Sequence, residues 1–214
     1  MADTARPAVA VVDYDAGNLH SVCKAAERVG LRAVPADSPS ALAAADAVIL
    51  PGVGAFADCM ARLDQRGFVG PLREHLAADR PFLGICLGLQ LLFTHGEEGD
   101  GAPGLGFFAG RVVRIAAPAR KVPHMGWNGL AFRRRTPLFD GLPEGQHVYF
   151  VHSYHAVPAD PSVVVATVDY GEDVTAAVGS GRVAAVQFHP EKSGGAGLRL
   201  LANFAACVRG EPPA

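Results

Sequence analysis

The chain has 214 residues, 50% of them hydrophobic, and a formal net charge of −2. These values predict one domain over residues 1–214 with a sizeable buried core and frayed ends at 1–7 and 210–214. They offer no electrostatic basis for binding nucleic acid or an anionic membrane. The N-terminal stretch MADTARPAVAVVDYD lacks the pattern of a secretion signal or a transmembrane helix, so we expect a cytoplasmic protein.

Short apolar runs alternate with helical repeats through the first half of the chain. We expect strands at 8–13, 31–34, 47–50 and 81–85, and helices at 19–29, 39–45, 55–66, 70–79 and 88–94. This alternation is typical of a mainly parallel α/β sheet flanked by helices.

The second half is richer in strand-like segments. We expect extra strands at 110–115, 147–151, 163–168, 174–178 and 183–188, and a closing helix at 197–208. The sequence contains no repeat, linker or low-complexity tract, which agrees with a single domain.

A candidate nucleophile lies where the strand at 81–85 gives way to a helix. There, Gly84-x-Cys86-x-Gly88 is the cysteine counterpart of the G-x-S-x-G elbow, whose glycines let strand and helix approach closely. The positive end of the following helix favours a thiolate, so we expect Cys86 to be nucleophilic. The motif alone describes a buried strand-end cysteine equally well, and its partner residues decide between the two.

A candidate base and its orienting group follow the last expected strand. The segment QFHPEKS delivers His189 at a strand end, and Pro190 stops the strand before Glu191. Thiol, imidazole and carboxylate are the groups needed to form a thiolate, accept its proton and hold one imidazole tautomer. Alone, His189 would be a hydrogen-bonded strand-end residue and Glu191 a solvated charge; with Cys86 they predict a catalytic triad.

A glycine-rich turn follows the strand at 47–50. The segment PGVG at 51–54 can present backbone N–H groups to an oxyanion, and Gly52 and Val53 are the candidates, with the Leu87 amide as a second donor. An ordinary connecting loop is the alternative. The lysine and glycine spacings of phosphate-binding loops are absent from this segment.

The remaining cysteines give no sign of reactivity. Cys23, Cys59 and Cys207 lie in helical patterns without metal or disulfide spacing, which is typical of ordinary buried thiols. We expect neither a cofactor nor a metal.

Taken together, the three segments resemble the class I, triad-type glutamine amidotransferases. Further segments are similar to the branch that serves imidazole glycerol phosphate synthases: DYDAGNL at 13–19, KVPHMGWN at 121–128, YFVHSY at 149–154 and QFHPEKS at 187–193. The resemblance covers nearly the whole chain. It implies a flavodoxin-like α/β fold and hydrolysis of glutamine to glutamate and ammonia through a cysteinyl thioester.

The same resemblance implies a substrate pocket and a partner. It assigns glutamine contacts to Gln90, Ser153 and Tyr154. The implied partner is a cyclase subunit with a (β/α)₈ barrel, which receives the ammonia through a channel and forms imidazole glycerol phosphate and aminoimidazole carboxamide ribotide in histidine biosynthesis. The residues implied to face this partner are Asn18, Met125, Trp127 and Lys192.

The chain departs from the family's pattern at Asp15, Ala16 and His155, which bear on the partner-facing edge rather than the triad. Three other functions stay open: a glutaminase subunit of another synthase, a stand-alone cysteine hydrolase of the same fold, and a binding module with decayed catalysis. An intact triad argues against the last of these.

Overall fold

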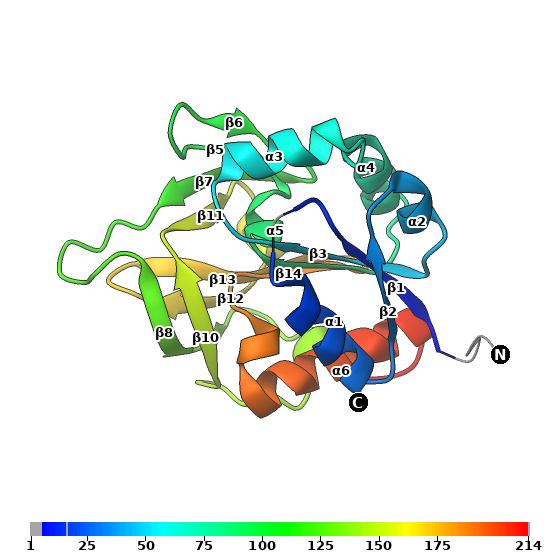
Figure 1. Cartoon of the computed structure of the whole chain (residues 1–214). Helices are drawn as coiled ribbons and strands as arrows, with labels where there is room; N and C mark the ends of the chain where they lie inside the picture. Colours follow the sequence, from blue (N-terminus) through cyan, green and yellow to red (C-terminus); the bar gives the residue numbers. More distant parts are fainter. Residues whose placement is uncertain (1–5, 16, 214) are drawn as a thin grey trace.

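A computed structural model describes residues 6–15 and 17–213 (Figure 1). Its centre is an eight-stranded sheet in the order β2-β1-β3-β4-β14-β13-β12-β9. The first five strands of that order are mutually parallel, and the last three continue the sheet in antiparallel pairs. Successive strands are added on one side of β1 (β2) and then on its other side (β3 and β4). This change of direction between β1 and β3 is where doubly wound α/β sheets open a crevice for ligands.

Helices and strands follow the chain without long irregular segments. In the first half the structure forms β1 (Ala8–Val12), α1 (Leu19–Arg28), β2 (Arg32–Ala36), α2 (Pro39–Ala43), β3 (Ala47–Gly52), α3 (Phe56–Gln65), α4 (Val69–Ala77), β4 (Phe82–Cys86), α5 (Leu87–Gln90), β5 (Phe93–Gly96) and β6 (Ala102–Pro103). In the second half it forms β7 (Phe108–Arg114), β8 (His124–Gly129), β9 (Ala131–Phe132), β10 (His147–His152), β11 (Tyr154–Pro158), β12 (Val164–Asp169), β13 (Asp173–Ser180), β14 (Val183–Val186) and α6 (Gly194–Arg209), with short 3-10 turns η1 (Pro137–Phe139), η2 (Pro161–Val163) and η3 (Pro190–Lys192).

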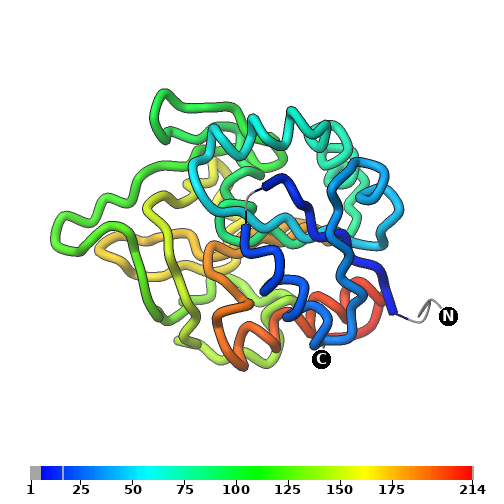
Figure 2. Tube along the Cα trace, in the orientation of Figure 1, coloured from blue at the N-terminus to red at the C-terminus, as the bar shows by residue number. Residues whose placement is uncertain are grey.

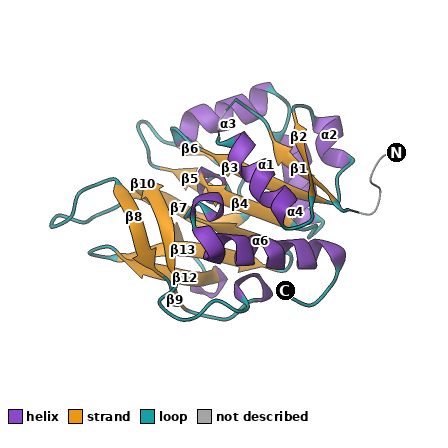
Figure 3. Cartoon of the chain, turned by 60° about the horizontal axis from the view of Figure 1, so that its bottom comes forward, coloured by secondary structure: helices purple, strands orange, loops and turns teal. Residues whose placement is uncertain are grey.

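Helices cover both faces of the central sheet. Helices α1 and α6 pack on one face, and α2, α3 and α4 pack on the other (Figures 1 and 3). Each face therefore has its own apolar core, and β1, β3 and β4 are buried along their whole length. Burial on both faces explains why these strands read as continuous apolar runs rather than alternating ones.

Two smaller sheets extend the fold to one side. Strands β11, β7, β5 and β6 form one sheet, and β8 pairs antiparallel with β10 to form a two-stranded ribbon. The Cα trace shows the ribbon at the side of the molecule away from α2 (Figure 2). Among the described residues, no helix combines the length and hydrophobicity needed to cross a membrane.

The predicted fold class is confirmed, with local differences. The helix expected at 88–94 is wrong: α5 is a single turn, and the chain enters β5 at Phe93, which pairs with Phe108. An unbroken apolar run such as Leu89 to Phe93 carries no periodicity to separate a helix from a strand. The strand expected to end at Leu50 continues to Gly52; β3 passes through a proline because its pairing with β1 already ends at Ile49.

Both chain ends are hydrogen-bonded further out than the sequence indicated. The Pro7 carbonyl accepts the Arg32 N–H at 2.9 Å, and the Glu211 N–H donates to Ala206 at 2.9 Å. Ala16, where the sequence departs from the family's pattern, lies outside the described residues, as do 1–5 and 214.

Candidate active site

Three neighbouring parallel strands carry the predicted site residues to one edge of the sheet. Strand β4 pairs with β3 on one side and with β14 on the other, so the three strands end together. Beyond their ends lie the 51–54 segment from β3, Cys86 from β4, and His189 shortly after β14. Residues far apart in the sequence therefore meet because parallel strands share one carboxyl edge.

The backbone at Cys86 is the strained elbow that the motif predicts. Cys86 has φ 55° and ψ −108°, a conformation that L-residues rarely adopt. A Cβ at Gly84 would lie 2.8 Å from the Gly88 carbonyl oxygen, and one at Gly88 would lie 1.9 Å from the Leu50 carbonyl oxygen. Both glycines are therefore required for β3, β4 and α5 to approach this closely.

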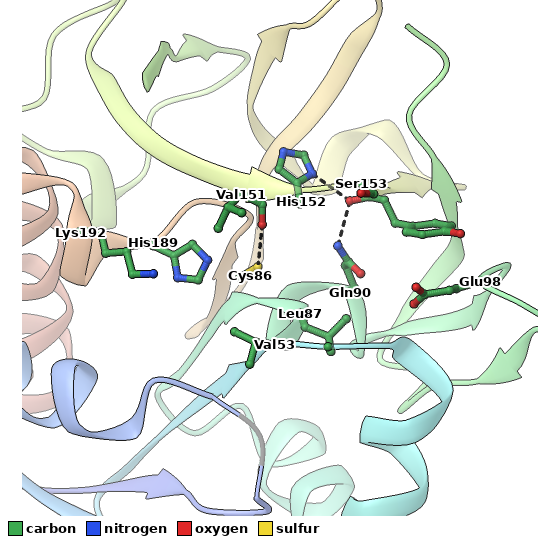
Figure 4. Close-up of a pocket in the computed structure, with 12 residues that line it drawn as sticks. Val53, Cys86, Leu87, Gln90, Glu98, Val151, His152, Ser153, His189 and Lys192 are labelled. Carbon is green, nitrogen blue, oxygen red and sulfur yellow. Dashed lines mark hydrogen bonds between the residues drawn. The ribbon is translucent and has the colours of Figure 1, made fainter. Parts of the chain in front are cut away.

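The Cys86 thiol sits between a carbonyl and an amide. Its Sγ lies 3.9 Å from the Val151 carbonyl oxygen (Figure 4). The Gln187 Nε2 donates to the same sulfur from 3.7 Å. Helix α5 has only four residues, so its dipole is weaker than that of the longer helix expected from the sequence. The positively charged neighbour of the sulfur is instead the His189 side chain.

His189 and Glu191 form a buried pair. His189 Nδ1 lies 2.8 Å from Glu191 Oε1, and the two side chains are only 3% and 1% exposed. This contact fixes the tautomer and orientation of the imidazole, as the third member of a triad does. It leaves Nε2 as the reactive nitrogen, and no hydrogen-bond partner within the described residues occupies that atom.

The charge of His189 is set by its two neighbours. Burial alone lowers the pKa of His189, but the adjacent Cys86 sulfur and the Glu191 carboxylate outweigh it and raise the pKa to about 9. The imidazole is therefore protonated at neutral pH. Together, Cys86 and His189 can attack a carbonyl carbon and then supply a proton to the leaving group.

Hydrogen bonds lock the segment that carries His189. Its N–H donates to the Tyr149 carbonyl at 2.9 Å, and its carbonyl accepts the Ser193 hydroxyl at 2.7 Å. Ser193 Oγ also accepts the Tyr149 N–H at 3.0 Å, which ties this segment to β10. Ser193 was not predicted as a site residue, although it closes the QFHPEKS segment.

A cavity of about 290 Å³ opens over the Cys86 sulfur (Figure 4). This Cys86 cavity is lined by Val53, Gly54, Cys86, Leu87, Gln90, Glu98, Val151, His152, Ser153, Tyr154, His189 and Lys192. Of the predicted catalytic and substrate residues, Gly52 and Glu191 do not line it. Gly52 is paired opposite Cys86 within the sheet, and Glu191 lies behind His189.

Sequence reasoning missed two residues of this site: Gln187, which is buried behind the cavity, and Glu98, which lines its far end. The Gln90 Nε2 donates to the Tyr154 carbonyl at 2.9 Å and to Gln187 Oε1 at 3.0 Å, so Gln187 links Gln90 to Cys86. Within the described residues, both hydrogen bonds of Gln90 are made by its amide nitrogen, so its amide oxygen stays available to a ligand. Glu98 adds a carboxylate to this end and holds α3 by accepting the Phe56 N–H at 2.8 Å. Gln187 belongs to a recognised motif, whereas no sequence pattern indicated Glu98.

The predicted partner-facing residues fall into two groups. Met125 and Trp127 are two positions apart on β8, so their side chains lie on the same face of the ribbon, and they are 62% and 56% exposed. Met125 is the cross-strand neighbour of Val151, which lines the Cys86 cavity. Lys192 lies at the cavity itself, beside His189 (Figure 4). Asn18 is the half-buried residue that precedes α1.

A buried histidine pair joins the β8–β10 ribbon to the cavity and makes stability pH-dependent. His124 Nδ1 lies 3.0 Å from His152 Nε2, and burial lowers their pKa values to about 4 and about 3. The unfolded chain, with histidines titrating near 6.5, takes up these protons first. Stability is therefore lost as the pH falls from about 6.5 toward 4, by about 1.4 kcal/mol per pH unit for each histidine.

This expectation is checked by urea unfolding at several pH values. A His124→Gln variant cannot titrate at that position, so its free energy of unfolding should fall less steeply below about pH 6.5 than that of the wild-type chain. Equal slopes would show that His124 is not kept neutral by its burial.

A comparison with known protein families shows the class to which the chain belongs. A family model described as "Glutamine amidotransferase class-I" matches residues 10–207. The chain belongs to this family, and its triad-like cluster lies inside the matched region.

Curated relatives identify the branch of the family. The "Imidazole glycerol phosphate synthase subunit HisH" of Thermosynechococcus vestitus is 54% identical, over 95% of this chain and 98% of that relative. Proteins of the same name from Syntrophotalea carbinolica and Moorella thermoacetica are 53% and 50% identical, over 92% and 94% of this chain and 98% and 95% of those relatives. Within the class, the chain therefore belongs with the HisH subunits.

Solved structures share the fold. One titled "Crystal structure of glutamine amidotransferase" has a TM-score of 0.72 at 22% identity, covering 92% of this chain and 98% of that one. A chain of "Structure of PurLQS from Thermotoga maritima" has a TM-score of 0.71 at 20% identity, covering 96% and 98%. At these identities the likeness shows the fold alone.

Proposed function

We propose that the chain is the glutaminase subunit of imidazole glycerol phosphate synthase and that Cys86, His189 and Glu191 hydrolyse glutamine to glutamate and ammonia. The observation that carries the proposal is the strained Cys86 at the floor of a cavity, beside a histidine whose other nitrogen is bound to a buried carboxylate. The test is release of glutamate from glutamine by the chain, measured alone and together with its cyclase partner.

In the first half of the reaction the Cys86 thiolate attacks the side-chain carbonyl carbon of glutamine. The new S–C bond places a negative charge on the carbonyl oxygen. Protonated His189 then gives its Nε2 proton to the amide nitrogen, the C–N bond breaks, and ammonia leaves behind a glutamyl thioester. Glu191 stabilises the imidazolium and holds it in position throughout.

In the second half, neutral His189 removes a proton from water as the water oxygen attacks the thioester carbon. The S–C bond breaks and the thiolate leaves, while the carboxyl group formed gives its remaining proton to solvent as glutamate is released. His189 keeps the proton taken from water, so the thiolate–imidazolium pair is restored. The raised pKa of His189 suits this cycle, because the imidazole must recover a proton at neutral pH.

The oxyanion needs N–H donors that point to the position its oxygen occupies once Cys86 has attacked the carbonyl carbon. Leu87 is the first residue of α5, so its amide has no acceptor within the helix and is a donor beside the sulfur. The 51–54 segment lies beside Cys86 on the neighbouring strand: Gly52 is paired with Cys86 in the sheet, and Val53 and Gly54 line the cavity. We assign the second donor to this segment.

Substrate orientation follows from the polar groups of the cavity. The free oxygen of Gln90 and the carboxylate of Glu98 are acceptors suited to the α-ammonium group of glutamine. Ser153 adds a hydroxyl, and Tyr154 an aromatic ring, at the same end. A ligand held there extends its side-chain amide toward Cys86, which places the reacting carbon over the sulfur.

The relatives are named as one subunit of a synthase, which implies a second, partner subunit. We assign its docking surface to the exposed Met125–Trp127 face of β8, next to the strand that lines the Cys86 cavity. An exposed tryptophan packed edge-on against Tyr149, at 6.0 Å between ring centroids, is a suitable interface anchor. A barrel cyclase seated there would receive ammonia without its release to solvent.

Replacing Trp127 with alanine is expected to weaken the complex with the cyclase subunit by about 30-fold in Kd, equivalent to about 2 kcal/mol. Titration calorimetry measures this loss, and glutamine turnover should recover at saturating cyclase. Val157→Ala is the matched control, because Val157 is 38% exposed on β11 and lies outside the Met125–Trp127 face. Unchanged affinity for Trp127→Ala would place the docking surface elsewhere.

Two rival functions are separated by the same reagents. A stand-alone cysteine hydrolase would turn over at full rate without a partner, whereas a synthase subunit is expected to be weak alone and faster in the complex. A glutaminase of another synthase would bind that synthase in a pull-down and would not bind the cyclase.

A further inference from the structure

Two buried side chains hold the 51–54 segment from behind. Tyr14 follows β1 and is 0% exposed, and Cys59 lies on α3 and is 1% exposed. Neither lines the Cys86 cavity, and the catalytic cycle above uses neither of them. Both nevertheless contact the segment that supplies the second oxyanion donor.

Each side chain contacts a different carbonyl of the segment. The Tyr14 hydroxyl donates to the Pro51 carbonyl at 2.9 Å, and the Cys59 thiol donates to the Val53 carbonyl at 3.4 Å. Gly52 lies between these carbonyls, and a Cβ on Gly52 would be 2.6 Å from the Tyr14 hydroxyl oxygen. Tyr14 therefore packs directly against the segment as well as bonding to it.

Both groups remain donors at physiological pH. Burial raises the pKa of Tyr14 well above its ordinary value, and the nearby Cys59 raises it further. Burial likewise raises the pKa of the Cys59 thiol. Their protons stay in place, so each can keep its hydrogen bond to a carbonyl oxygen.

Fixing a carbonyl also fixes an amide. In a trans peptide the C=O and the following N–H point in opposite directions. With the Val53 carbonyl turned toward Cys59, the Gly54 N–H is directed away from α3, and Gly54 lines the Cys86 cavity. With the Pro51 carbonyl turned toward Tyr14, the Gly52 N–H is directed away from Tyr14, and Gly52 is the last residue of β3 paired with β4. Gly54 has φ 103°, so rotation of its peptide groups is unusually free unless something holds it.

We propose that Tyr14 and Cys59 are positioning residues that set the orientation of the 51–52 and 53–54 peptide groups, and so preorganise the amides of this segment for the oxyanion. The inference rests on the proposed glutaminase function. Tyr14 and Cys59 would then affect the rate of acyl transfer, because N–H donors that are already oriented need not reorganise when the negative charge develops.

The test uses the complex with the cyclase subunit and the double variant Tyr14→Phe/Cys59→Ala, which deletes the two donors and keeps the ring. We expect kcat for glutamine hydrolysis to fall roughly tenfold or more while KM changes by less than about twofold, because the lost interaction acts only in the transition state. Cys59→Ser keeps a donor for the Val53 carbonyl, so Tyr14→Phe/Cys59→Ser should recover part of the loss.

Alkylation of Cys86 by iodoacetamide, followed by peptide mass spectrometry, distinguishes the loss of oriented oxyanion donors from a general disruption of the Cys86 site. This reaction displaces iodide at a saturated carbon and forms no oxyanion, so its rate should match wild type in the double variant. Cys207→Ala is the matched control, because Cys207 is a half-buried cysteine on α6, and this variant should leave both rates unchanged.

An unchanged kcat in the double variant, or alkylation that slows as much as kcat, would overturn the inference. If the double variant does not fold, the comparison of Cys59→Ala with Cys59→Ser decides: equal kcat values would overturn the inference. Failure of the proposed function looks different, since the wild-type complex itself would then release no glutamate.

Discussion

Glutamine hydrolysis by the assembled complex is expected to fall by a factor of about 10⁴ or more when Cys86 is replaced by alanine. The variant removes the atom that forms the thioester, and the described residues around the cavity offer no other cysteine close to His189. Alanine keeps the side-chain volume small, so the elbow and the cavity should persist. Glutamate release, measured by a coupled dehydrogenase assay, reports the loss.

Cys23→Ala is the matched control for this variant. Cys23 lies half-buried on α1, away from the Cys86 cavity, and its removal should leave turnover within about twofold of wild type. Binding of the cyclase should be unaffected by either change. Retention of normal turnover by Cys86→Ala would show that the nucleophile has been assigned to the wrong residue.

The second large effect is on folding, and it is expected for Gly88→Ala. The added Cβ would lie 1.9 Å from the Leu50 carbonyl oxygen, a backbone atom inside the central sheet that cannot rotate away. Strand β3 and α5 must separate to admit it, which we expect to lower the free energy of unfolding by about 3 kcal/mol or more. Urea unfolding followed by circular dichroism measures the change.

Gly70→Ala provides the matched comparison. Gly70 lies in α4, and a Cβ there meets no atom within 4 Å, so alanine should stabilise the chain by about 0.5–1 kcal/mol. If Gly88→Ala unfolded within about 1 kcal/mol of wild type, the close approach of β3 and α5 would not be a constraint on the elbow.

The parts of the fold that the sequence predicted are those with strong local signals. Strands β1, β3 and β4 are buried on both faces and read as continuous apolar runs, and α1 and α6 have clear helical repeats. The strands that were missed have weak signals. Strand β8, HMGWNG, contains two glycines and few β-formers, while β6 and β9 have two residues each.

The candidate site shows the same division. Cys86, His189 and Glu191 stand in compact motifs, because an elbow and a strand-end base impose local spacing. The contacts that surround them join residues distant in the chain: Gln90 meets Gln187 across 97 positions, and Tyr14 meets Pro51 across 37. Such pairs are created by the order of strands in the sheet, which a single sequence does not reveal.

The most direct test of the mechanism is acid quenching of the cyclase complex during glutamine turnover, followed by mass spectrometry of the Cys86 peptide. We expect a glutamyl group on Cys86 that is absent without glutamine and absent in Cys86→Ala. Steady release of glutamate by a complex whose glutamyl group appears on another residue, together with undiminished turnover by Cys86→Ala, would contradict it.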